Sequence, residues 1–124
     1  MTYTLFLDDI RFPADVAYDH RFGPYKGVII CRNYDDAVWL VEQRGLPNFV
    51  SFDHDLADEH YGKDTGEKTG YTFAKWLCDY MLVNYIDNGL LIPETFGYRV
   101  HSMNPVGAEN IRQYIDNFLR HMRD

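Results

Sequence analysis

Short apolar runs and longer periodic segments alternate along this chain. Four compact apolar runs are bounded by acidic, glycine or proline residues, as strands buried on both faces usually are: residues 3–7, 27–32, 49–52 and 98–102. Three further segments repeat apolar side chains with the 3.6-residue period of a helix: residues 37–44, 73–85 and 111–122. The pattern predicts four strands and three helices in the order β-β-α-β-α-β-α.

Capping residues predict where the helices begin and end. Asn33 is a plausible N-cap of the first helix, and Gly45 stops it. The second helix ends at Asn88-Gly89, and Asn104-Pro105 starts the third with proline at its first position. Strands that alternate with helices imply right-handed crossovers and a parallel sheet. The fold class expected is therefore α/β.

Segment 10–26 does not fit this alternation. Pro13, Gly23 and Pro24 leave no room for a long helix, and its apolar residues have no steady period. The segment is either a lid over one end of the sheet or a covering for a sheet face, and we favour the covering.

Composition limits the class of protein. The 124 residues, 46% hydrophobic and 16% aromatic, suffice for one domain spanning 1–124 without disulfides or a structural metal. A net charge of −7 argues against an extended nucleic-acid-binding face, although contact with a nucleic acid end stays open. Cys31 and Cys78 lie in apolar segments and are expected to be buried thiols. Because no leader and no run of 18 apolar residues is seen, we expect a cytoplasmic protein without membrane contact.

Acidic residues gather where the predicted strands end. Asp8 and Asp9 follow the first strand, residues 53–55 the third, and residues 101–104 the fourth. Ligands of parallel α/β sheets bind outside the carboxyl ends of the strands, so these residues should share one rim.

Converging carboxylates repel one another unless a cation neutralises them. The rim is therefore a candidate site for Mg²⁺ or Mn²⁺, with Asp8, Asp9, Asp53 and Asp55 as candidate ligands. The alternative is that Asp8 or Asp9 caps the next segment and that Asp55 or Asp58 lies in a solvated loop.

Two further features could bind a phosphate. Thr69-Gly70 opens the second helix and would present backbone N–H groups to an anion, although many helices begin with threonine and bind no ligand. Ser102 and Asn104 follow His101 at the end of the fourth strand and are candidate substrate-binding residues. A histidine at a strand end is often structural, but the acids opposite favour a functional His101.

These residues carry a family resemblance. LFLDDIR and FVSFDHDL look like the first and third strands of a two-component receiver domain, with Asp53 at the phosphoacceptor position and Asp55 where a metal-contacting residue lies. Together with TGYTFAKWL and HSMNPVGAENI, they resemble the cyclic-phosphate-processing receiver domain family over most of the chain. The resemblance implies a receiver-like three-layer fold, a four-stranded parallel sheet of order 2-1-3-4, and a Mg²⁺ pocket at Asp8, Asp9 and Asp53.

The chain also departs from a standard receiver, which has five strands and a lysine ending the last. Here four strands are predicted, and His101 takes the lysine position. Lysine is a fixed positive partner for a phosphoryl group, whereas histidine can also exchange a proton near neutral pH. The replacement favours acid–base work on a phosphate ester.

The resulting hypothesis is a metal-dependent phosphoesterase acting on a cyclic phosphate, either an RNA end or a nucleotide. Asp53 attacks phosphorus or orients a water, and His101, or alternatively His54, protonates the leaving oxygen. Thr69-Gly70 binds the remaining anionic oxygens. Lys63 and Lys68 could add positive charge, although we favour a solvated loop as the explanation for both.

Three other classes of protein stay open. A Mg²⁺-dependent nuclease or primase-type site also combines an acid with Asp-x-Asp, but the acidic net charge argues against it. A receiver-type phosphoacceptor would be phosphorylated on Asp53 without turnover. A module that binds a nucleotide or a partner protein would keep its affinity after loss of His101.

Overall fold

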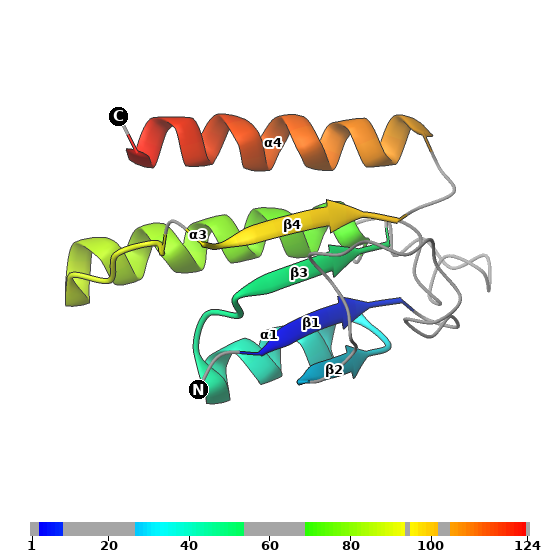
Figure 1. Cartoon of the computed structure of the whole chain (residues 1–124), viewed down its shortest axis with the longest axis horizontal. Helices are drawn as coiled ribbons and strands as arrows, with labels where there is room; N and C mark the ends of the chain where they lie inside the picture. Colours follow the sequence, from blue (N-terminus) through cyan, green and yellow to red (C-terminus); the bar gives the residue numbers. More distant parts are fainter. Residues whose placement is uncertain (1–2, 9–26, 54–68, 94, 102–104, 124) are drawn as a thin grey trace.

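Four parallel strands form the centre of the molecule in the order β2-β1-β3-β4 (Figure 1). The computed structural model describes residues 3–8, 27–53, 69–93, 95–101 and 105–123. The strands are β1 (Thr4–Leu7), β2 (Val28–Cys31), β3 (Phe49–Phe52) and β4 (Gly97–Val100). The helices are α1 (Tyr34–Arg44), α3 (Gly70–Asn88) and α4 (Pro105–Arg123). The predicted α/β class and the sheet order 2-1-3-4 are confirmed.

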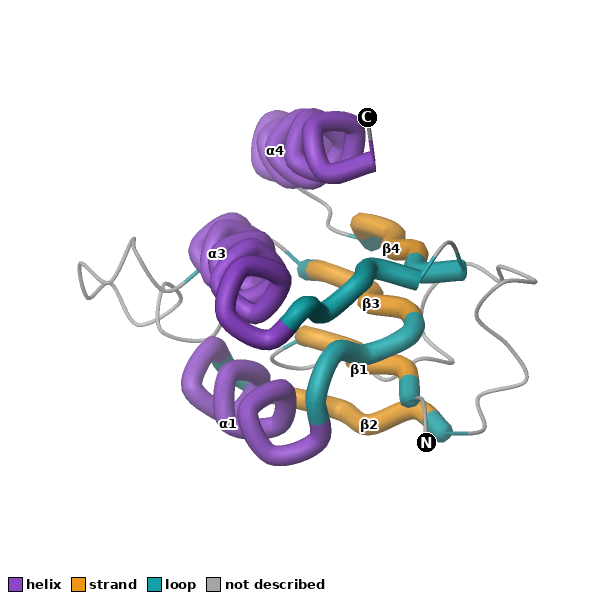
Figure 2. Tube along the Cα trace, turned by 90° about the vertical axis from the view of Figure 1, so that its left-hand side faces the viewer, coloured by secondary structure: helices purple, strands orange, loops and turns teal. Residues whose placement is uncertain are grey.

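The two faces of the sheet pack differently. Leu5, Leu7, Val50 and Phe52 belong to the large core that also contains the buried side chains of the three helices. Phe6 belongs to a smaller cluster with Phe49, Val28 and Ile30, as expected because successive side chains of a strand point to opposite faces. Figure 2 shows α1 and α3 on one side of the sheet.

Local capping chemistry sets the helix ends. The Asn33 side chain accepts a hydrogen bond from the backbone N of Asp36 at 2.8 Å, and α1 ends at Gly45. Gly89 ends α3 with φ of 71°, the left-handed conformation that glycine adopts at little cost. Pro105 is the first residue of α4. The predicted helix boundaries at Asn33, Gly45, Asn88-Gly89 and Pro105 are confirmed.

Three strands differ slightly from the prediction, and the first difference is that β1 begins at Thr4 and not at Tyr3. We expected the fourth strand at residues 98–102, but β4 ends at Val100, which is the register partner of Phe52, the last residue of β3. We expected the second strand to begin at Gly27, but this glycine has φ of 73° and forms the turn before β2. His101 therefore follows its strand directly, as Asp8 follows β1.

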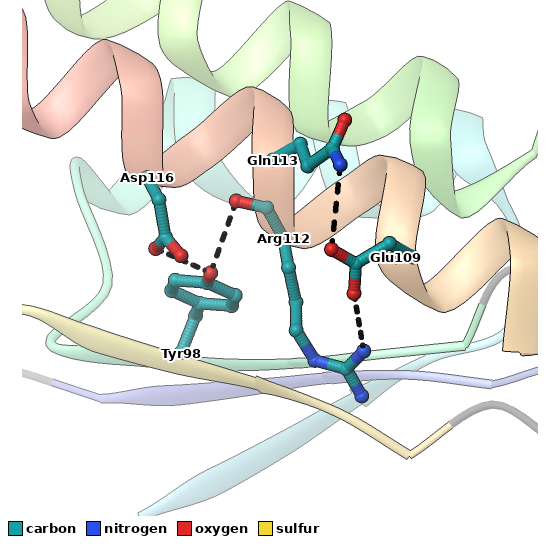
Figure 3. Close-up of polar contacts among 5 residues, drawn as sticks. All are labelled: Tyr98, Glu109, Arg112, Gln113 and Asp116. Atoms are coloured by element: carbon teal, nitrogen blue, oxygen red, sulfur yellow. Dashed lines mark hydrogen bonds and ion pairs between the residues drawn. The ribbon is translucent and has the colours of Figure 1, made fainter.

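A hydrogen-bonded tyrosine joins β4 to α4 (Figure 3). The Tyr98 hydroxyl donates to Asp116 Oδ1 at 2.6 Å and lies 3.4 Å from the carbonyl oxygen of Arg112. On the same helix, Glu109 accepts from Arg112 Nη1 at 3.3 Å. Burial, followed by the hydrogen bond to Asp116, raises the pKa of Tyr98. This contact holds β4 against α4 at a residue two positions before the end of the strand.

Segment 10–26, expected to be a lid or a covering, lies outside the described residues. The helices that the structure does describe contribute to one core on the Leu5 face of the sheet, so they account for one helical layer of the expected three-layer fold. None of these helices is long and apolar enough to cross a membrane.

Both cysteines are buried free thiols, as predicted. Burial raises the pKa of Cys31 to about 12, with a smaller contribution from the negative charge of Asp36. Burial also raises the pKa of Cys78 to about 12, with Asp79 contributing in the same way. Both thiols are therefore protonated and inaccessible in the folded protein.

We expect a thiol reagent at mildly alkaline pH to modify Cys31 and Cys78 only as fast as the protein unfolds. The reaction with thiolate is suppressed because both pKa values lie well above that of an ordinary cysteine. Labelling followed by mass spectrometry measures the rate, and the protein in guanidinium provides the fully reactive control. Rapid modification of either thiol in the native protein would contradict the buried placement.

Candidate functional site

A row of polar residues follows the aligned ends of the strands. Asp8 follows Leu7, Asp53 follows Phe52 and His101 follows Val100, and these preceding residues are paired across β1, β3 and β4. The backbone ladder continues one step into the row, because Asp53 N donates to Leu7 O and His101 N to Phe52 O, both at 2.9 Å. The structure thus brings Asp8, Asp53 and His101 to one edge of the sheet.

These three side chains are buried. Asp8 is 1% exposed, Asp53 5% and His101 9%. Charged residues are rarely buried unless they are paired, hydrogen-bonded or bound to a metal, because loss of hydration is costly. The burial of two carboxylates at neighbouring strand ends therefore identifies this edge as a candidate site.

Three contacts fix the imidazole ring of His101. Its Nε2 lies 2.9 Å from Asp8 Oδ2, and its Nδ1 lies 2.6 Å from the Oγ of Ser51. The ring stacks on Phe6 with 4.7 Å between centroids and an interplanar angle of 3°. Both polar atoms of the ring are therefore within hydrogen-bond distance of protein groups.

This arrangement bears on the expected role of His101 as a general acid. To protonate a substrate directly, Nε2 would have to exchange Asp8 for the leaving oxygen of the substrate. In the structure as it stands, the imidazole orients the Asp8 carboxylate. The role of general acid stays a prediction for His101. The contacts add a second role, which is to orient the carboxylate of Asp8.

Asp8 is also held through its backbone. Its N–H donates to Cys31 O at 3.1 Å, and its carbonyl oxygen accepts from Arg32 Nη1 at 3.2 Å. Arg32 follows Cys31 at the end of β2, so it extends the row of polar residues by one strand. The guanidinium thereby anchors the chain at Asp8 on the side away from β3.

Sequence interpretation missed three residues of this edge. Ser51, Phe6 and Arg32 were not named as candidates, because Ser51 and Phe6 lie inside apolar runs and Arg32 closes one. Strand alternation could have found Ser51, since it is two residues before Asp53 and so faces the same side of the sheet. The stacking of Phe6 on a histidine 95 residues away has no local signal.

The N-terminus of α3 is capped as the sequence indicated. Thr69 Oγ1 accepts from Thr72 N at 3.2 Å, and Thr72 Oγ1 accepts from Thr69 N at 3.2 Å, which together form a capping box. Figure 1 shows α3 beginning at the end of the molecule toward which the strands point. The Thr69 hydroxyl serves as the cap, so an anion here would be bound by backbone N–H groups beginning at Gly70.

Several predicted site residues lie outside the described residues: Asp9, His54, Asp55, Ser102 and Asn104. Within residues 3–8, 27–53, 69–93, 95–101 and 105–123, no three histidine, cysteine or acidic side chains are grouped to hold a metal. Asp8 and Asp53 are therefore the two described candidates for a metal site, and both offer the oxygen ligands that Mg²⁺ and Mn²⁺ prefer.

We expect His101→Ala to lower the free energy of unfolding by about 3 kcal/mol. The variant loses the contacts to buried Asp8 and Ser51, at about 1–3 kcal/mol, and the stacking on Phe6, at about 1 kcal/mol. Urea denaturation measures the loss. His121→Ala, at an exposed position of α4, is the matched control and should change stability by less than about 0.5 kcal/mol. Equal losses in the two variants would refute a structural role for the His101 contacts.

Comparison with known families gives one match. The model of the family described as "Cyclic-phosphate processing Receiver domain" covers residues 3–117. Searches of curated proteins and of solved structures gave no match. The matched range includes all four strands, α1, α3, most of α4 and the whole row of polar residues. The parallel sheet, its strand order and this match agree, and the chain belongs to the cyclic-phosphate processing receiver domain family.

Proposed function

We propose that this protein is a metal-dependent phosphoesterase that opens a cyclic phosphate. The observation that carries the proposal is the pair of buried carboxylates, Asp8 and Asp53, at adjacent strand ends in a family associated with cyclic-phosphate processing. The net charge of −7 argues against an extended nucleic-acid-binding face, so the proposed substrate is a small phosphate group, such as a cyclic nucleotide or the cyclic end of an RNA.

Asp8 and Asp53, with Asp9 and Asp55, would hold Mg²⁺ or Mn²⁺. Such a cation would polarise a phosphoryl oxygen and offset the repulsion between the carboxylates. The contact from His101 is compatible with this role, because a carboxylate offers about four lone-pair directions and the imidazole uses one. Metal-binding carboxylates are commonly oriented by such an outer hydrogen bond.

The other residues would bind and attack the substrate. Asp53 either orients a water that attacks phosphorus or attacks it directly, and after direct attack a water cleaves the bond between Asp53 and the phosphate. In both routes the bond from phosphorus to one ring oxygen breaks. The first-turn N–H groups beginning at Gly70 hold anionic oxygens of the phosphate, and Ser102 and Asn104 extend this contact surface. The released ring oxygen takes up a proton.

His101 and His54 are the two candidates for the proton donor. Direct donation by His101 requires Nε2 to leave Asp8, from which it is separated by 2.9 Å. If His101 instead serves to hold Asp8, His54 supplies the proton. The two assignments make different kinetic predictions.

A receiver-type phosphoacceptor is the second candidate function. Asp53 directly follows β3, the strand between β1 and β4, which matches the position of the phosphoacceptor in receiver domains. In that case Asp53 would accept a phosphoryl group from a small donor and hold it, without turnover of a cyclic phosphate.

The decisive test is incubation with a panel of cyclic phosphates and Mg²⁺ or Mn²⁺, followed by phosphorus NMR. We expect ring opening of at least one compound and a loss of several orders of magnitude in Asp53→Asn, which removes the nucleophile or water-orienting group. Circular dichroism checks that this variant stays folded. Phosphorylation of Asp53 by acetyl phosphate, with no compound opened, would replace the phosphoesterase by the receiver switch.

Metal binding can be tested without a substrate. Mg²⁺ at about 100 times its Kd should stabilise the folded protein by about 2.7 kcal/mol, seen as a rise in melting temperature. Asp8→Asn should remove most of this rise. Asp87→Asn, which makes the same change on the exposed surface of α3, should keep it. A full Mg²⁺ response in Asp8→Asn would exclude Asp8 from the metal site.

A pair of substitutions separates the two roles of His101. If the imidazole is the proton donor, His101→Ala and His101→Gln should both slow turnover about 10² to 10⁴ fold. The loss should be smaller for substrates with a good leaving group. If His101 only holds Asp8, His101→Gln should keep most of the activity, since an amide N–H can still donate, and His54→Ala should show the leaving-group dependence instead.

A further inference from the structure

Ser51 is a buried hydroxyl with a restricted choice of partner. It lies in the middle of β3, is 0% exposed, and its Oγ is 2.6 Å from His101 Nδ1. Within the part of the chain that the structure describes, this is the hydroxyl's one hydrogen-bond contact. A buried hydroxyl that donates to nothing is costly, so its hydrogen is directed at Nδ1.

The direction of this hydrogen bond determines the tautomer of the ring. A nitrogen that accepts a hydrogen bond carries no hydrogen of its own, so the proton of the neutral imidazole must be on Nε2. Nε2 faces Asp8 Oδ2 at 2.9 Å, where a donor is required. The two contacts are therefore consistent: Ser51 donates to the ring, and the ring donates to Asp8.

The other states of the ring fit the contacts less well. The opposite tautomer would place the lone pair of Nε2 against a carboxylate oxygen and leave the Ser51 hydrogen without its acceptor. A doubly protonated ring would also direct an N–H at Ser51 and displace the same hydrogen. The parallel stacking on Phe6 fixes the plane of the ring in which both contacts are made.

We infer that Ser51 is a positioning residue that holds His101 with its proton on Nε2 and, through it, orients the carboxylate of Asp8. The Nε2–H then donates to Asp8 Oδ2 and fixes the direction in which the carboxylate faces. A carboxylate oriented in this way binds a cation more tightly, because outer hydrogen-bond partners hold metal ligands in place. This consequence for metal binding rests on the proposed function, whereas the tautomer follows from the contacts alone.

Nitrogen NMR of the full-length protein tests the tautomer directly. Long-range proton–nitrogen spectra, recorded without metal at a pH above the ordinary pKa of histidine, distinguish protonated from unprotonated ring nitrogens. The chain has five histidines, and His101→Gln identifies the signals of His101 by their loss. We expect a protonated Nε2 and an unprotonated Nδ1. A protonated Nδ1 in the wild type would overturn the inference.

Variants at position 51 test the role of the hydroxyl. In Ser51→Ala, a fraction of His101 with the proton on Nδ1 should appear, and Ser51→Thr, which keeps the hydroxyl on a residue suited to strands, should restore the wild-type spectrum. Tyr98→Phe is the matched control, because it removes another 2.6 Å hydrogen bond from β4 without touching His101. An unchanged His101 spectrum in Ser51→Ala would overturn the inference.

Mg²⁺ titration monitored by calorimetry extends the test to Asp8. We expect Ser51→Ala to bind Mg²⁺ about 10-fold more weakly, which is the smallest loss usually seen when an outer hydrogen-bond partner of a metal ligand is removed. Ser51→Thr and Tyr98→Phe should bind Mg²⁺ normally. Equal affinity in wild type and Ser51→Ala would refute the link to Asp8. If the tautomer is as inferred but the wild type binds no Mg²⁺, the proposed metal site is refuted and the inference about Ser51 stands. If Mg²⁺ binds but the tautomer is reversed, the inference is refuted and the proposed metal site stands.

Discussion

The hydrogen bond between His101 and Asp8 is the interaction on which the site depends. A carboxylate that is 1% exposed has lost nearly all contact with water, and a buried charge without a donor is among the most destabilising features a protein can contain. His101 supplies one such donor from a position 93 residues further along the chain. The site therefore exists only when the first and last strands are both in place.

The regular register of the sheet makes this long-range contact possible. Each strand of the parallel sheet is four residues long, and the residue after each strand falls into the same row. A shift of one residue in any strand would turn its side chains to the opposite face. The caps at Asn33, Gly45, Thr69 and Gly89 place the helices that bury the other face and so hold this register.

Much of the fold could be predicted from the sequence, because local signals determine it. Apolar runs mark the strands, and caps such as Asn33 and Pro105 mark the helix ends. The rim was predictable from strand order, since Asp8 and Asp53 end adjacent parallel strands. The contacts of His101 with Ser51 and Phe6 could not be predicted. In the sequence, both residues look like ordinary buried positions of apolar strands. Their contacts arise only when three strands are side by side.

His101 also connects parts of the sheet that are not neighbours. In the order β1-β3-β4, its ring reaches from the end of β4 across β3 to a residue that follows β1, while Ser51 of β3 contacts the same ring. Further back on β4, Tyr98 is tied to Asp116 of α4. The contacts to Asp8 and to the C-terminal helix thus start from residues only three positions apart in the chain. One four-residue strand and the residue that follows it therefore carry both the contact to the C-terminal helix and the contact to the Asp8 carboxylate.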